Sequence, residues 1–276
     1  MPKFIVGARL HDYGKGSPDE LFGRVAADGF AAVQLAYKKC VPSVRSYADV
    51  TDALVAETIA AEKAHSIQVA VLGTYVELAI NDESRLKNAA DFKSQLAVCK
   101  ALGAGCIGTE TTAMSKQPAG TTREEAQELL CRSLADILPA AEALGVTVAV
   151  EPVTYHSMNS AAATRHILDT MRSPNLKVIF DMSNLVDAGN VGAQDRIWND
   201  VGELLGDQIV AVHFKGQAFA PDGGLLHTSL EDSLTDYAGA FAMLRQLPQD
   251  ALPVLREEAV PARAASDIAF MRGFFA

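Results

Sequence analysis

The sequence predicts an α/β fold, the (β/α)8 or TIM barrel, as a single domain over residues 1–276. Short apolar segments alternate with longer amphipathic segments from end to end, which favours a parallel sheet covered by helices. Eight such units fit into the 276 residues, and a usual barrel needs about 250 residues. A doubly wound open sheet would normally carry a glycine-rich phosphate turn after its first strand, but Gly14-x-Gly16 lacks the third glycine.

The predicted strands are short runs of apolar residues. The fifth run, residues 146–150, has no polar alternation beyond Thr147, which is typical of a strand covered on both faces. Pro152 cannot donate to a ladder, so pairing should end just after Glu151. The eight predicted strands cover residues 4–7, 31–35, 68–72, 106–108, 146–150, 177–180, 208–212 and 253–256.

Capping signals delimit the predicted helices. Ser17 followed by Pro18 opens the first helix, and a Thr-x-x-Glu capping box within residues 121–125 opens the fourth. Gly103 and Gly145 are suited to left-handed helix ends. The predicted helices cover residues 17–28, 51–65, 83–102, 121–145, 161–172, 195–205, 234–247 and 261–275.

Composition excludes several classes of protein. With 49% hydrophobic residues the chain can bury a full core without disulfides. A formal net charge of −10 argues against binding of nucleic acid. No apolar run reaches the length of a membrane span, and the run after Met1 is too short for a signal peptide. The four cysteines lack C-x-x-C spacing, and we interpret them as reduced core thiols of a cytoplasmic protein.

Ligand-type residues follow four successive predicted strands. Glu151, Asp181 and His213 end the fifth, sixth and seventh strands, and Glu257 or Glu258 ends the eighth. The carboxyl ends of barrel strands meet over one mouth, where active sites of this fold lie. Three carboxylates and one imidazole suit a divalent ion, with Mn²⁺ as the first choice and Mg²⁺ or Co²⁺ as alternatives. Such an ion can stabilise the ene-diolate that forms when a proton leaves a hydroxy-ketone.

Several segments resemble the sugar phosphate isomerase/epimerase family, which belongs to the xylose isomerase-like TIM barrels. The Glu-Pro-Val sequence at Glu151 and the Asn-Leu-Lys-Val-Ile-Phe-Asp sequence that ends at Asp181 are fairly specific to that family. The matching segments are residues 7–12, 34–36, 108–111, 151–159, 173–185 and 212–215.

The resemblance implies roles for the residues at the strand ends. The metal ligands would be Glu151, Asp181, His213 and Glu257, and the two glutamates would also form the catalytic acid/base pair. Glu257 is preferred to Glu258 because the family pattern has its acid four residues after a proline like Pro253. Ketose 3-epimerases of the superfamily carry histidine three residues after the aspartate, where this chain has Asn184. That difference argues against 3-epimerisation of a free ketose.

Other residues near the predicted strand ends are candidates for substrate binding. The resemblance assigns His156 and Asn159 to the pocket lining. Glu110 and Lys215 follow the fourth and seventh strands, and His11, Arg9 and Lys39 follow the first two, where they would contact a polyol or an anionic group. His227 lies in a long loop after the seventh strand that could form a lid. The residues that we expect to bind the substrate are His156, Asn159, Glu110, Lys215, Asn184 and His11.

We therefore expect a metal-dependent isomerase or epimerase of a sugar or related polyhydroxy-carbonyl compound. A metal-dependent lyase or dehydratase is an open alternative, because elimination begins with the same proton abstraction. An abasic-site endonuclease is disfavoured by the acidic charge and by only one histidine at a strand-end ligand position. A barrel that binds a ligand without turnover also stays open. Barrels of this kind often pair, so a homo-oligomer is one expectation.

Overall fold

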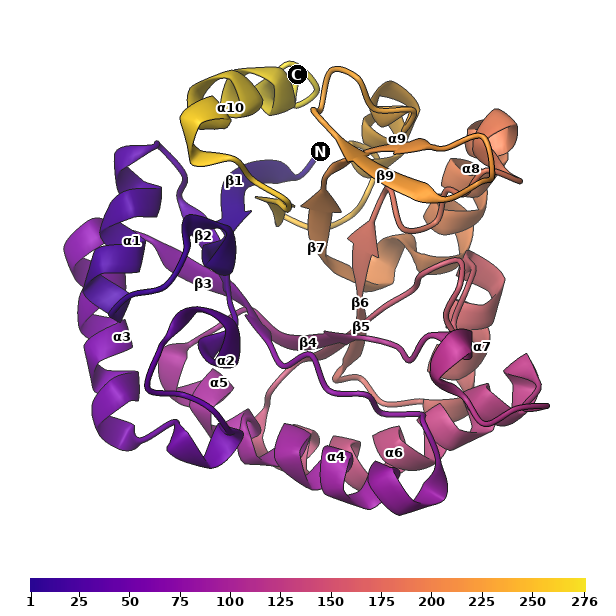
Figure 1. Ribbon diagram of the computed structural model, residues 1–276, viewed down its shortest axis with the longest axis horizontal. Helices are drawn as coiled ribbons and strands as arrows, with labels where there is room; N and C mark the ends of the chain where they lie inside the picture. The colour runs from indigo at the N-terminus through magenta and orange to yellow at the C-terminus, as the bar shows by residue number, and fades with distance from the viewer.

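Eight parallel strands close into a barrel in the computed structural model, which describes residues 1–276 (Figure 1). The strands follow one another around the barrel in chain order, and β1 pairs with β10 from Lys3 and Ala251 to Ala8 and Arg256. The predicted TIM barrel is therefore confirmed. The barrel strands are β1 (Lys3–Arg9), β2 (Ala32–Leu35), β3 (Gln68–Gly73), β4 (Cys106–Glu110), β5 (Val148–Glu151), β6 (Leu176–Asp181), β7 (Ile209–Phe214) and β10 (Ala251–Arg256).

Helices surround the barrel on its outer face (Figure 1). The capping boxes of Ser17 with Glu20 and of Thr122 with Glu125 are both present. Gly103 and Gly145 end their helices with φ of 65° and 68°, as expected for left-handed caps. The helices are α1 (Pro18–Ala27), α2 (Tyr37–Cys40), α3 (Asp52–His65), α4 (Asp82–Ser94), α5 (Leu96–Leu102), α6 (Arg123–Leu144), α7 (Ala161–Met171), α8 (Gln194–Leu205), α9 (Tyr237–Leu244) and α10 (Ala264–Arg272).

Three predicted segments differ from the structure. The predicted helix 83–102 is divided into α4 and α5 at Gln95, whose buried side chain donates a hydrogen bond to the Tyr47 carbonyl. The predicted helix 234–247 covers only Tyr237–Leu244, because Asp236 is its N-cap and accepts a hydrogen bond from Gly239 N. The predicted helix 261–275 opens with a short 3₁₀ turn and becomes α-helical at Ala264.

The segment predicted as a long loop after the seventh strand forms a β-hairpin. Strands β8 (Gly216–Phe219) and β9 (Leu225–Thr228) pair antiparallel, with Gln217 opposite His227. Gly223 at the turn has φ of 86°, a conformation that glycine adopts without steric cost. The lid candidate His227 therefore lies on a regular strand that is mostly exposed.

Small and branched side chains fill the barrel interior. A buried cluster from seven of the eight strands comprises Ala32, Ala70, Val71, Cys106, Ala149, Ile179, Ala211 and Leu255. Gly108 belongs to the same layer, since a Cβ atom there would lie 2.5 Å from Ile179 Cδ1. This packed layer closes the barrel beneath the mouth.

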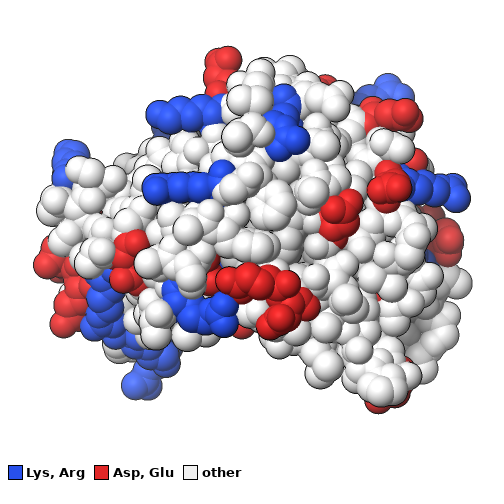
Figure 2. Space-filling model, turned by 90° about the horizontal axis from the view of Figure 1, so that it is seen from above, with Lys and Arg blue, Asp and Glu red and all other residues white.

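All four cysteines are free thiols, and three of them are buried. None of the helices combines the length and the apolar character that a membrane crossing requires. On the face shown in Figure 2, single basic side chains lie among acidic ones over a mostly uncharged surface.

A buried ion pair anchors the last helix to the last strand. Arg256 Nε at the end of β10 donates to Asp267 Oδ2 of α10 at 2.8 Å, and both side chains are almost fully buried. The Arg256 guanidinium also donates to the carbonyl of Glu257. The pair therefore fixes the backbone from which the Glu257 side chain projects.

We expect Asp267→Ala to lower the free energy of unfolding by about 3–5 kcal/mol, because it leaves the Arg256 charge buried without a partner. Chemical denaturation followed by circular dichroism measures this loss. Asp200→Ala is the matched control: the Asp200–Arg196 pair is exposed, so its loss should change stability by less than about 0.5 kcal/mol. Equal effects of the two substitutions would contradict the anchoring role.

Candidate metal and active site

Four ligand-type side chains meet at the carboxyl ends of neighbouring strands. Glu151 and Asp181 are the last residues of β5 and β6, His213 is the penultimate residue of β7, and Glu257 directly follows β10. Asp181 is opposite His213 in the sheet register, and His213 is opposite Leu255. All four side chains are buried. The register therefore carries these residues to one place although they are far apart in the chain.

The His213 imidazole lies between two glutamates. Its Nδ1 atom is 3.2 Å from Glu151 Oε2 and 3.4 Å from Glu257 Oε1. Ligand atoms of Glu151, Asp181 and His213 all lie within 4.8 Å of one another. The other ring nitrogen of His213, Nε2, is buried and has no hydrogen-bond partner. Buried polar atoms of this kind are costly unless something binds them. This Glu/Asp/His triad can bind a divalent ion, and its oxygen and nitrogen donors suit one.

Basic side chains surround Glu257. Lys215 Nζ lies 2.8 Å from Asp181 Oδ2 and 3.5 Å from Glu257 Oε2, and it is buried. On the other side, Arg9 Nη1 lies 3.8 Å from Glu257 Oε1. Burial favours the neutral acid, but the attraction of these cations and of His213 outweighs it and lowers the pKa of Glu257 to about 2. Glu257 is therefore ionised at neutral pH.

The other carboxyl groups differ from Glu257 in proton affinity. Burial, more than the opposing attraction of His213, raises the pKa of Glu151. Burial and the repulsion of Glu151 raise the pKa of Glu110 to about 7. For His213, burial disfavours the charged ring, but Glu257 and Glu151 together raise the pKa to about 9.

Hydrogen bonds hold the carboxylates in place. Asn184 Nδ2 donates to Glu151 Oε1 at 2.6 Å, and the backbone N–H groups of Ser183 and Asn184 donate to Asp181 Oδ1 at 2.8 and 3.0 Å. The loop after β6 is also tied to the loop after β5, because Thr154 N donates to the Asn184 carbonyl. Asn184 thus positions a ligand-type carboxylate through its side chain.

The structure separates Glu257 from Glu258. Glu258 is partly exposed, has φ of 54° and pairs with Arg9 Nη2 at 2.8 Å. That same guanidinium binds Asp12 Oδ1 at 2.7 Å. Glu257 is thus the glutamate that faces His213, while Glu258 turns toward Arg9.

Two predicted pocket residues lie apart from the acid cluster. His156 packs against Tyr155, has Nδ1 3.4 Å from Thr111 Oγ1, and accepts a hydrogen bond from Arg123 through its carbonyl. Asn159 precedes Ser160, the N-cap of α7. Neither residue lines the pocket beside Glu151 and Glu257, in contrast to Glu110. The predicted residues His11, Asn184 and Lys215 are also absent from that lining.

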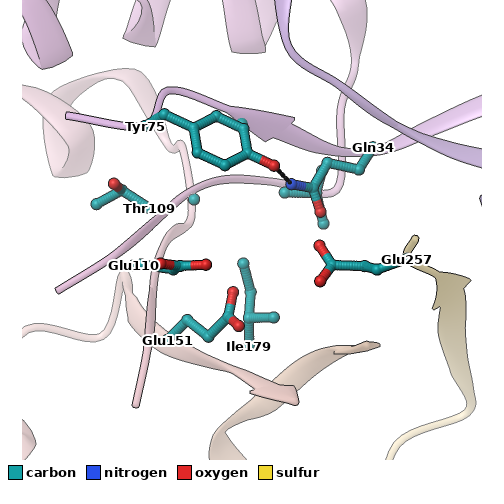
Figure 3. A pocket seen from close by; sticks show the side chains of 10 residues that line it. Gln34, Tyr75, Thr109, Glu110, Glu151, Ile179 and Glu257 are labelled. Atoms are coloured by element: carbon teal, nitrogen blue, oxygen red, sulfur yellow. Dashed lines mark hydrogen bonds between the residues drawn. The ribbon is translucent and has the colours of Figure 1, made fainter. Parts of the chain in front are cut away.

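The pocket has walls that the sequence analysis did not assign. Gln34, Tyr75 and Thr109 line it together with Glu110, Glu151 and Glu257 (Figure 3). Gln34 Nε2 donates to the Tyr75 hydroxyl at 3.0 Å. Gln34 was visible as the one polar residue within the second strand run. Tyr75 follows β3 with φ of 52°, and nothing in the sequence pattern distinguished it.

A family comparison matches residues 22–273 to the xylose isomerase-like TIM barrels. The chain belongs to this family. It is thus a xylose isomerase-like TIM barrel with a buried Glu/Asp/His triad. No curated protein matches the sequence.

Solved structures of the same fold match nearly the whole chain. The apo 3-keto-D-glucoside 4-epimerase YcjR from E. coli is 17% identical with a TM-score of 0.72, covering 98% of this chain and 100% of that one. A zinc-bound IolI protein is 15% identical with a TM-score of 0.77, covering 98% and 96%. A magnesium complex from Mycobacterium smegmatis, itself described as a xylose isomerase-like TIM barrel protein, is 13% identical with a TM-score of 0.71, covering 98% and 96%. At these identities the likeness shows the fold.

We expect binding of Mn²⁺ to the metal-free protein to release about one proton at pH 7. A pKa of about 9 leaves His213 protonated there, and a ligating imidazole must be neutral. Apparent affinity should therefore rise with pH and level off above about pH 9. Titration calorimetry in two buffers of different ionisation enthalpy counts the protons.

His65→Gln serves as the control, because His65 lies on α3 and pairs with the surface residue Asp19. The proton count should be unchanged in that variant. Mn²⁺ affinity that is independent of pH between 6.5 and 9 would show that His213 is not a ligand.

Proposed function

We propose that this protein is a divalent-metal-dependent isomerase or epimerase of a sugar or related polyhydroxy-carbonyl compound. The observation that carries the proposal is the convergence of three carboxylates and one imidazole, all buried, at the mouth of the barrel. One structural relative is an epimerase of a keto-glucoside. That relative supports the class of chemistry.

Glu151, Asp181, His213 and Glu257 would hold the ion. When bound, a divalent ion supplies a Lewis acid that polarises a substrate carbonyl and makes the neighbouring C–H more acidic. Mn²⁺ is the first choice from the donor set, with Mg²⁺ and Co²⁺ as alternatives. Zinc and magnesium occur in two structural relatives.

Glu151 and Glu257 form the proton-transfer pair. Their carboxylates project from different strands toward one space, with Glu110 beside Glu151 (Figure 3). The pKa of Glu151 is raised and that of Glu257 is lowered, so Glu151 is the stronger base of the two. Glu151 would remove the carbon-bound proton and leave an ene-diolate. Delivery of a proton to the adjacent carbon would give isomerisation, and delivery to the opposite face of the original carbon would give epimerisation.

The remaining walls suit a polyhydroxylated compound. Gln34 Oε1 is a buried acceptor without a hydrogen-bond partner, and Glu110 has no basic partner within 4 Å. Both can accept hydrogen bonds from substrate hydroxyls. Lys215 would lie close to the oxygen that the reaction makes negative, since it already contacts two of the ligand carboxylates.

We expect Glu151→Gln to slow metal-dependent exchange of carbon-bound hydrogen with solvent by about 10²–10⁴-fold, the usual contribution of a general base. The assay incubates Mn²⁺-loaded protein in D₂O with a panel of keto-sugars and ketoses, and proton NMR follows the loss of C–H signals. The amide keeps the size of the side chain, so circular dichroism should be unchanged.

Glu57→Gln is the matched control, because Glu57 is exposed on α3. This variant should catalyse hydrogen exchange at the wild-type rate. Exchange that persists in Glu151→Gln would refute the role of Glu151. Products that have lost water would instead support a lyase or dehydratase, the alternative that shares this proton abstraction.

A further inference from the structure

Lys39 is a cation near the pocket that has no carboxylate partner. Its ammonium lies 3.8 Å from the centre of the Tyr75 ring, and no acidic oxygen lies within 4 Å of it. Arg9, the other cation on this side, is already bound by Asp12 and Glu258. Tyr75 lines the pocket, whereas Lys39 is exposed and does not line it, so the contact with the Tyr75 ring is what links the Lys39 charge to the space where a substrate would lie.

The surroundings of Lys39 place its charge at the mouth of the barrel. Arg9, Glu110, Glu257 and Glu258 all interact with it electrostatically, although these residues come from β1, β4 and the end of β10. Partial burial and the repulsion of Arg9 lower the pKa of Lys39. An anion placed beside the ammonium would relieve both effects.

His11 provides a second polar group at the same ring. It packs edge to face against Tyr75 with the ring centres 5.7 Å apart, and its Nδ1 atom is buried without a hydrogen-bond partner. Lys39, in the segment after β2, and His11, in the segment after β1, thus contact the same aromatic ring. Each of these two side chains can still form a hydrogen bond. Neither takes part in the acid cluster.

We propose that Lys39 and His11 bind a carboxylate of the substrate, so that the substrate class is a polyhydroxy-carbonyl acid. This inference rests on the proposed function, because it identifies the substrate of the same site. A single unpaired ammonium matches one negative charge. A phosphate dianion is disfavoured because Glu110, Glu257 and Glu258 lie near the same position and the Arg9 guanidinium is already occupied.

The test compares two ligands that differ in one group. D-gluconate and D-glucitol share a polyol chain and differ by a carboxylate in place of a CH₂OH group, and titration calorimetry measures both on the Mn²⁺-loaded full chain. Wild-type protein should bind gluconate about tenfold more tightly, the value of one partly exposed charge-assisted hydrogen bond. Lys39→Met should abolish this preference and leave glucitol affinity unchanged.

Lys38→Met is the matched control. Lys38 is the preceding residue of the same short helix and also lies over a tyrosine, 4.6 Å from the centre of the Tyr47 ring. Tyr47 is not part of the pocket lining. This variant should keep the wild-type preference for gluconate.

Three outcomes would overturn the proposal. Gluconate and glucitol binding equally, or neither binding, would remove the carboxylate site. A preference that survives Lys39→Met would assign the carboxylate to the metal. D-glucitol 6-phosphate binding more tightly than gluconate, with loss in Lys39→Met, would assign the site to a phosphate. Each result is separate from the proposed function, which stands or falls on hydrogen exchange in Glu151→Gln.

Discussion

The burial of three carboxylates beside one imidazole is the constraint on which the mouth of this barrel depends. Glu151, Asp181 and Glu257 are each less than 5% exposed, and His213 lies among them. Carboxylates that are close together and buried repel one another, and each ionised form also loses its hydration. The folded chain tolerates this cost because the core below is large and the barrel strands fix the residues by register. A divalent cation would offset the cost directly.

The protein's own basic side chains offset the cost of burying these carboxylates to different extents. As a result, the two glutamates Glu151 and Glu257 differ in proton affinity. Glu257 lies among His213, Lys215 and Arg9 and is therefore held as an anion. Glu151 has the neutral amide of Asn184 and the shared imidazole. The difference in proton affinity follows from which strand ends carry basic residues. The buried Arg256–Asp267 ion pair also fixes the backbone at Glu257, because Arg256 donates a hydrogen bond to the Glu257 carbonyl.

Strand ends could be predicted from the sequence because a buried parallel strand is a short apolar run and its last residue is visible. Glu151, Asp181 and His213 were located in this way, and the structure joins them. The place of Tyr75 in the pocket could not be predicted, because its contact with Gln34 joins β2 to the loop after β3 and leaves no local pattern around Tyr75. The division of one helix at Gln95 and the hairpin after β7 likewise depend on tertiary hydrogen bonds. His156 and Asn159 were assigned by resemblance alone, and their own contacts lie outside the pocket lining.

Asn184 occupies the position at which, by the family resemblance, ketose 3-epimerases carry a histidine. This residue is therefore one point at which the present barrel differs from them. Its amide donates to Glu151 and does not titrate, so it orients the base without adding a second proton carrier. In the proposed mechanism, proton transfer would then be confined to the glutamates. Discrimination between substrates would fall to Gln34 and Tyr75 of the pocket lining and to Lys39, which contacts the Tyr75 ring. On this proposal, side chains of β2 and of the segments after β1, β2 and β3 would select the substrate, while the acid cluster would be common to barrels of this fold.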